Sequence, residues 1–131
     1  MDSQKDIQKT DGLTKFIDNQ ALKTNPFGEN RVGERAYRRA ERLAAAIVLL
    51  TNHIPDIDPL KHSARQASIE LLKSLMSVKD EMRASNSERG RDLKSSVRSL
   101  ISLVRLLAVS GSVSFQNADA VTEALDELAS F

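Results

Sequence analysis

Apolar side chains recur along most of the chain at alternating intervals of four and three residues. The first such series is formed by Ala36, Ala40, Leu43, Ile47, Leu50 and Ile54. This spacing places the side chains on one stripe of a helix, as in helices that pack against other helices. We therefore expect a helix over about residues 33–53, and Pro55 and Pro59 interrupt the pattern after it.

Three further helices are expected, over about residues 59–83, 87–111 and 115–131. Asp58 can cap the first of them, because its carboxylate accepts hydrogen bonds from N–H groups and Pro59 suits the first helical position. Gly111 can end the second in a left-handed conformation, and Ser114 can cap the third. Connections of about 3–6 residues are typical of antiparallel neighbours.

This pattern predicts an all-α fold. We expect an antiparallel up-down-up-down four-helix bundle at residues 31–131, preceded by a flexible N-terminal arm at residues 1–30. The arm is polar, and it contains Gly12 and the turn-forming sequence Asn-Pro-Phe-Gly at residues 25–28. A short helical segment can form within it around Leu13, Phe16 and Ile17.

Composition narrows the class of protein. Apolar residues make up 40% of the 131 positions and aromatic residues only 4%, so the core must be built from Leu, Ile, Val and Ala. The absence of cysteine excludes disulfides and thiolate chemistry. No secretory signal is recognisable, and the longest apolar run, residues 43–50, is far shorter than a membrane span. We expect a single-domain cytoplasmic protein that has no membrane partner.

The residue types that catalysis requires are sparse. His53 and His62 are the only histidines, and they flank the proline-interrupted turn without a recognised metal-ligand spacing. Serine is abundant in the second half, but no histidine lies where the pattern would make it an adjacent base. A glycine-rich phosphate loop is also missing. We expect no catalytic residues, no cofactor and no metal, and therefore a protein that acts by binding and is not an enzyme.

Positive charge is concentrated in two segments, although the net charge is only +1. Residues 31–53 and 86–111 each hold five basic residues against two acidic ones, whereas residues 112–131 hold four acidic residues and no basic one. In helical register the basic side chains form one ridge on each of two helices. Together with an arginine of the intervening helix, the candidate nucleic-acid-binding residues are Arg31, Arg35, Arg38, Arg42, Arg65, Arg91, Lys94, Arg98 and Arg105.

Two interpretations of the ridges are open. Arginine forms paired, charge-assisted hydrogen bonds with phosphate, so the ridges can follow an RNA backbone. Alternatively, the basic helices meet an acidic protein or the acidic last helix of another copy, and the chain is a protein-interaction adaptor without nucleic-acid binding. Apolar side chains off the principal stripes favour a homo-oligomer; they are Val48, Leu49, Ile101 and Leu103.

The order of several residues resembles a known family. Tyr37 and the apolar stripe at 43–54 are followed by a proline break and then by Ala64-Arg65. Later come Arg98, the sequence Val-Arg-Leu-Leu-Ala at 104–108, a glycine and a serine-started last helix. Over residues 31–131 this order looks like the small four-helix bundle proteins that accompany the reverse transcriptase of diversity-generating retroelements. Those proteins are similar to the proteins encoded within ribosomal-RNA intervening sequences.

The resemblance implies a ring-shaped homopentamer with a basic surface. That surface would contact a reverse transcriptase and its template RNA during mutagenic copying. The positions that the resemblance carries over as basic contacts are Arg35, Arg38, Arg42, Arg65, Arg98 and Arg105.

Overall fold

The computed structural model of the chain describes residues 10–18, 24–77 and 88–130, and most of these residues are helical. The helices are α2 (Thr10–Asp18), α3 (Arg31–Thr51), α4 (Pro59–Ser77), α5 (Glu88–Val109) and α6 (Phe115–Ala129). No strand occurs within the described ranges. The expectation of an all-α fold is therefore confirmed.

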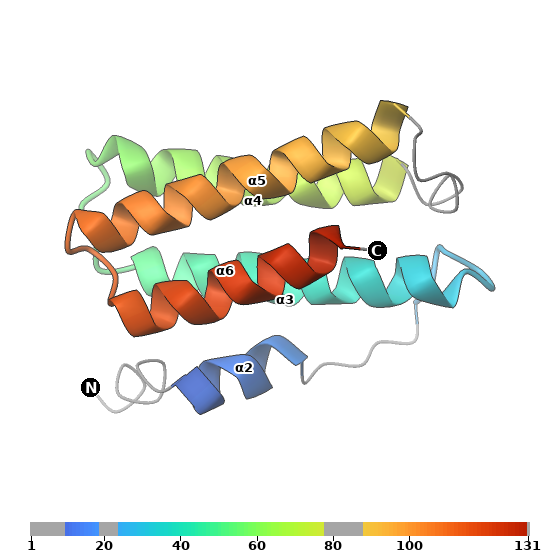
Figure 1. Cartoon of the computed structure of the whole chain (residues 1–131), viewed down its shortest axis with the longest axis horizontal. Coiled ribbons are helices and arrows are strands. Elements are labelled where there is room, and N and C mark those ends of the chain that lie inside the picture. The colour runs from blue at the N-terminus through green and yellow to red at the C-terminus, as the bar shows by residue number, and fades with distance from the viewer. Residues whose placement is uncertain (1–9, 19–23, 78–87, 131) are drawn as a thin grey trace.

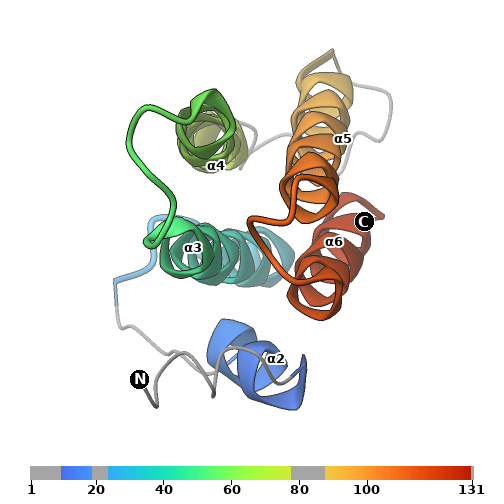
Figure 2. The same ribbon diagram turned by 90° about the vertical axis from the view of Figure 1, so that its left-hand side faces the viewer.

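Four of the helices enclose a common interior. Among α3, α4, α5 and α6, each helix packs against two of the other three, in the cyclic order α3, α4, α5, α6 and back to α3. Their axes run along the length of the molecule (Figure 1). Viewed from the end, α3 and α5 lie at opposite corners of this arrangement (Figure 2). The loops at residues 52–58 and 110–114 lie at the same end of the molecule (Figure 1).

The interior is filled by the apolar stripes that the sequence indicates. Leu43, Leu71, Leu100 and Leu125 are each almost fully buried, one from each of the four helices. Burial of a leucine side chain stabilises the fold by about 1.5–3 kcal/mol, which explains why the alternating spacing persists through every helix. Ile101, one of the candidates for a subunit contact, is also part of the core.

Short polar side chains determine where two helices begin. Asn30 caps α3 by accepting a hydrogen bond from the backbone N–H of Gly33 at 2.9 Å. This cap explains why α3 starts two residues earlier than expected, at Arg31. Ser114 caps α6 as expected, because its hydroxyl accepts from the N–H of Asn117 at 3.1 Å.

Of the helix ends predicted from the sequence, the structure describes the end of α5 at the expected glycine. Gly111, the second residue after α5, has a φ of +84°, which confirms the predicted left-handed residue at this end. α4 is helical to Ser77. The end that we expected for this helix, near residue 83, lies outside the described residues.

The first 30 residues contain more structure than the predicted flexible arm. α2 packs against both α3 and α6, on the side of the molecule opposite α4 and α5 (Figure 2). Leu13 and Ile17 are 1% and 2% exposed and belong to the hydrophobic core. Their spacing of four residues places both on one face of the helix, and burying that face offsets the entropy lost on ordering. Residues 1–9 and 19–23 of the expected arm lie outside the described residues.

A turn connects this segment to α3. The Asn25 side-chain oxygen accepts from the N–H of Phe27 at 3.0 Å, and Gly28 has a φ of +61°, which favours glycine. Phe27 is buried and its ring centroid lies 5.5 Å from that of Tyr37. The turn is therefore anchored to α3 by an aromatic contact.

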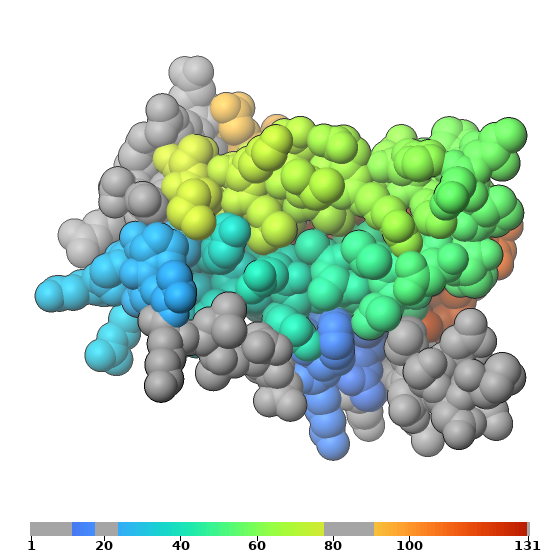
Figure 3. All heavy atoms as spheres, turned by 180° about the vertical axis from the view of Figure 1, so that it is seen from behind, coloured from blue at the N-terminus to red at the C-terminus, as the bar shows by residue number. Residues whose placement is uncertain are grey.

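The face formed by α3 and α4 is shown in Figure 3, where α4 lies along α3 and the start of α3 projects at one end. Val48 and Leu49 of α3 are 40% and 37% exposed, in contrast to Ile101. None of the described helices is long and apolar enough to cross a membrane.

Candidate nucleic-acid interface

Three of the predicted arginines surround one pocket at the start of α3. The pocket has a volume of about 730 Å³ and is lined by Arg31, Arg35 and Arg38, together with Glu29 and Glu34 and residues of the preceding turn. Arg31 and Arg35 are exposed, and within the described ranges their side chains form no hydrogen bond or ion pair. The two guanidinium groups are therefore accessible to an external anion.

Arg38 is held more firmly than its two neighbours. Its Nη1 donates to Glu34 Oε2 at 3.2 Å, one helical turn earlier. Its Nε is buried and has no hydrogen-bond partner among the described residues. The ion pair fixes the guanidinium at the edge of the pocket and neutralises part of its charge.

Arg42 is occupied within the fold. Its Nε donates to the backbone oxygen of Phe16 at 2.9 Å, and its guanidinium carbon lies 4.0 Å from the centroid of the Phe16 ring. These contacts join α3 to α2 through a hydrogen bond and a cation–π interaction. The structure therefore gives Arg42 a role in attaching α2, which the ridge pattern did not reveal.

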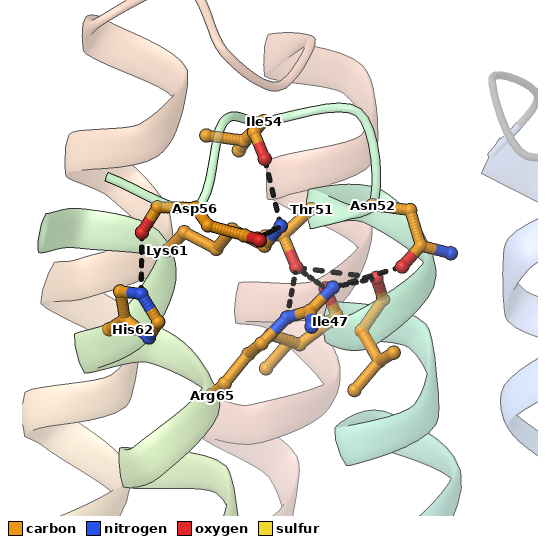
Figure 4. Close-up of polar contacts among 9 residues, drawn as sticks. Ile47, Thr51, Asn52, Ile54, Asp56, Lys61, His62 and Arg65 are labelled. Carbon is orange, nitrogen blue, oxygen red and sulfur yellow. Dashed lines mark hydrogen bonds and ion pairs between the residues drawn. The ribbon is translucent and has the colours of Figure 1, made fainter. Parts of the chain in front are cut away.

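Arg65 also has a role within the fold, since it joins α4 to the end of α3 (Figure 4). Its Nε donates to Thr51 Oγ1 at 2.9 Å, and its Nη2 donates to Val48 O at 3.1 Å and to Asn52 Oδ1 at 3.0 Å. The last carbonyls of a helix lack partners within the helix, so Arg65 satisfies one of them, Val48 O, and its positive charge interacts favourably with the negative end of the helix dipole. Sequence reasoning placed Arg65 with the RNA contacts, and its hydrogen bonds instead fix the junction between two helices.

The adjacent loop is held by Lys61. Its Nζ donates to Ile54 O at 2.8 Å and to Asp56 Oδ1 at 2.7 Å, and the lysine is only 6% exposed (Figure 4). The hydrogen bond and the positive charge of Lys61 lower the pKa of the Asp56 carboxyl below its ordinary value. His62 contacts the backbone oxygen of Asp56 through Nε2. Sequence reasoning missed Lys61, because nothing in its spacing distinguishes it from a solvated lysine.

Neither histidine belongs to a metal-binding cluster in the described part of the chain. His53 Nε2 lies 2.6 Å from the backbone oxygen of Ser112, which links the loop at 52–58 to the loop at 110–114. No group of three or more histidine, aspartate or glutamate side chains that could hold a metal ion occurs among the described residues. Both rings therefore hold loops in place.

The remaining basic candidates lie on α5. Arg91, Lys94, Arg98 and Arg105 are all exposed on that helix. Arg98 and Arg105 line a groove of about 560 Å³ between α5 and α6, and its opposite side carries the carboxylates of Asp119, Glu123 and Asp126. Three carboxylates so close to two arginines disfavour a phosphate at this place by like-charge repulsion. The acidic sequence of the last helix could have suggested that its carboxylates lie near basic residues. Only the structure shows which face of α6 is turned toward α5.

The two basic ridges do not form one continuous surface. α3 and α5 lie at opposite corners of the helical arrangement and share no substantial contact (Figure 2). Arg39 of α3 forms an ion pair of 3.1 Å with Glu127 of α6. The structure thus brings together Arg31, Arg35 and Arg38, and it separates them from the α5 residues.

Comparisons with known proteins leave the site to be interpreted on its own chemistry. No protein-family model matches the chain, and comparisons with curated proteins and with solved structures found no similar chain.

Proposed function

We propose that this chain is a non-catalytic, self-associating accessory protein that binds structured RNA through the start of α3. The observation that carries this proposal is the pocket lined by Arg31, Arg35 and Arg38. The resemblance described for the sequence adds a reverse transcriptase as the protein partner. In this reading α3 to α6 form an antiparallel up-down-up-down bundle, which presents the pocket at one end.

The chemistry of the pocket suits a phosphate backbone. Arg31 and Arg35 stand four residues apart on one side of α3, about 6 Å along the helix axis. Consecutive phosphates of a nucleic-acid strand are separated by a similar distance, so both guanidinium groups can engage one strand. The partial positive charge at the start of a helix adds to the attraction of an anion. Glu29 and Glu34 lower the net positive charge of the pocket. We therefore expect the pocket to bind an RNA whose fold brings several phosphates close together.

Binding without catalysis agrees with the surroundings of the titratable groups. The two histidines contact backbone carbonyls, and the lowered pKa of Asp56 arises from an ion pair that holds a loop.

A substitution pair tests this proposal. Arg31→Ala/Arg35→Ala should weaken binding to a structured RNA about tenfold at low salt, because two phosphate contacts are lost. The matched control is Lys15→Ala/Lys73→Ala, which removes two exposed positive charges outside the pocket and should change affinity far less. Fluorescence anisotropy with a labelled RNA hairpin measures both.

The rival function is a protein-interaction adaptor that binds no nucleic acid. The ion pair between Arg39 and Glu127 favours it, because it shows a basic helix meeting the acidic helix of this chain. Equal RNA affinities of the pocket variant and its control would reject the RNA surface and leave the adaptor as the better account.

A further inference from the structure

The groove between α5 and α6 has walls of opposite charge. Arg98 and Arg105, seven residues apart, form the basic wall on α5. Asp119, Glu123 and Asp126 form the acidic wall on α6, at spacings of four and three residues. The floor is apolar, since Ile101 and Ala120 line the groove and are only 4% and 7% exposed.

The charges of the two walls are not paired with each other. Within the described residues no hydrogen bond or ion pair joins Arg98 or Arg105 to the carboxylates across the groove. Each wall therefore offers a row of charged side chains to a partner that approaches from outside.

Apolar side chains continue both walls at one end of the groove. Val109 stands four residues after Arg105, and Phe115 stands four residues before Asp119, so each lies on the same ridge as its wall. They are 72% and 64% exposed. Phe115 and Val109 flank the loop at 110–114, which closes α5 onto α6 (Figure 1). The face is consequently charged along most of its length and apolar at the loop end.

We propose that this face binds a second copy of the same chain, around a two-fold axis that runs along the groove. A rotation about this axis turns the second copy to face the first. It places the α5 wall of one copy opposite the α6 wall of the other, and the loop ends of both copies stay at the same end of the groove. The basic wall of each copy then meets the acidic wall of the other, twice in one interface. The apolar loop ends of the two copies also meet, because equivalent helices of the two copies run in the same direction, and α5 of each copy faces the antiparallel α6 of the other.

The alternative orientations fail on charge. A two-fold axis across the groove would place the basic walls opposite each other and the acidic walls likewise, and like charges in contact are strongly unfavourable. It would also place Phe115 of one copy against the charged end of the other. A contact between two different surfaces would leave half of these charges without partners. The closed pair places each wall opposite the complementary one, with two arginines facing three carboxylates on either side of the axis, and such self-complementarity is typical of isologous interfaces.

This inference rests on the self-association included in the proposed function and names its surface and symmetry, with a dimer in place of the pentamer that the sequence resemblance implies. It uses no residue of the pocket at the start of α3. The two proposals can therefore fail separately, since RNA affinity reports on Arg31 and Arg35 whereas molecular mass without RNA reports on the α5–α6 face.

Complementary charge reversal provides the test. One variant, Arg98→Glu/Arg105→Glu, has two acidic walls, and the other, Glu123→Lys/Asp126→Lys, has a predominantly basic face. In sedimentation experiments on the full chain we expect a wild-type mass of twice 14.5 kDa. Each variant alone should associate at least about tenfold more weakly. An equimolar mixture of the two should restore a dimer that contains one copy of each.

Controls separate the interface from folding. Circular dichroism should show both variants to be as helical as the wild type, because every altered side chain is exposed. Should a reversal unfold the chain, Val109→Ser/Phe115→Ser tests the same face without changing charge and should also weaken the dimer. Arg31→Ala/Arg35→Ala should leave the mass unchanged. A monomeric or pentameric wild type, or folded variants whose mixture forms no mixed dimer, would overturn the proposal.

Discussion

Individual arginines of similar spacing have different roles in this protein. Arg65 satisfies the end of α3 through three hydrogen bonds, and Arg42 attaches α2. Arg31 and Arg35, in contrast, extend from the start of α3 into a pocket open to solvent. The partner of each guanidinium, and not its position in a ridge, therefore decides whether it can bind an external anion.

Replacing Arg65 should affect stability and leave RNA binding unchanged. Arg65→Ala removes charged hydrogen bonds to Thr51, Val48 and Asn52, and the expected loss is about 1.5–3 kcal/mol in the free energy of unfolding. Urea denaturation measures it. Lys73→Ala, at an exposed position of the same helix, should change stability by less than about 0.5 kcal/mol. Equal effects of the two substitutions would remove Arg65 from the junction.

Asp56 should contribute to the acid sensitivity of the fold. Lys61 lowers the pKa of its carboxyl in the folded chain, so the pairing stabilises the protein above the ordinary pKa of about 3.9. This stabilisation is lost as the pH falls through the lowered folded pKa. Asp56→Asn should therefore flatten the decline in unfolding free energy as the pH falls below the ordinary carboxyl range. Parallel stability curves for wild type and variant would show that the pair contributes nothing.

At the scale of elements, α2 is an integral part of the helical assembly. Its apolar face covers the seam between α3 and α6, and Arg42 holds it from the side. A helix of nine residues has little stability of its own in water. Its order therefore depends on the burial of Leu13 and Ile17.

Truncating Leu13 tests this dependence. Leu13→Ala should lower the free energy of unfolding by about 2–5 kcal/mol, because it leaves a cavity in the core. Lys15→Ala on the exposed side of the same helix is the matched control. A loss below about 0.5 kcal/mol for Leu13→Ala would mean that α2 is not packed in solution as described.

The sequence allowed the helices to be predicted because their signals are local. The alternating apolar intervals, Ser114 as a cap and Gly111 as a left-handed end are each determined by a few neighbouring residues. The packing of α2 was not predicted, because the partner of its Phe16 carbonyl is an arginine 26 residues away. A short apolar pattern does not reveal whether a distant groove exists to receive it.

The candidate site was predictable only as a set of residue types. Spacing identified the arginines, and it also placed Arg98 and Arg105 on one face of a helix. It could not show that this face meets Asp119, Glu123 and Asp126, since the rotation of α6 against α5 depends on the packing of both helices. The same limitation hid the ion pair between the buried Lys61 and the exposed Asp56.

In the whole molecule, the two surfaces for which we propose functions are separate. The pocket at the start of α3 carries a small excess of positive charge, whereas the α5–α6 face carries two arginines on one wall and three carboxylates on the other. The pocket lies on α3, and α5, which carries the basic wall of the groove, lies at the opposite corner (Figure 2), whereas α6 packs against α3. A dimer formed through α5 and α6 would therefore leave both RNA pockets exposed, one on each copy, and allow bivalent binding.

The salt dependence of RNA binding tests the central claim most directly, namely that Arg31 and Arg35 contact phosphates. Each phosphate contact contributes about 0.7–0.9 to the slope of log affinity against log salt concentration. If Arg31 and Arg35 each contact one phosphate, Arg31→Ala/Arg35→Ala makes this slope shallower by about 1.4–1.8. The control Lys15→Ala/Lys73→Ala keeps the wild-type slope. A pocket variant that retains the wild-type slope would contradict the account.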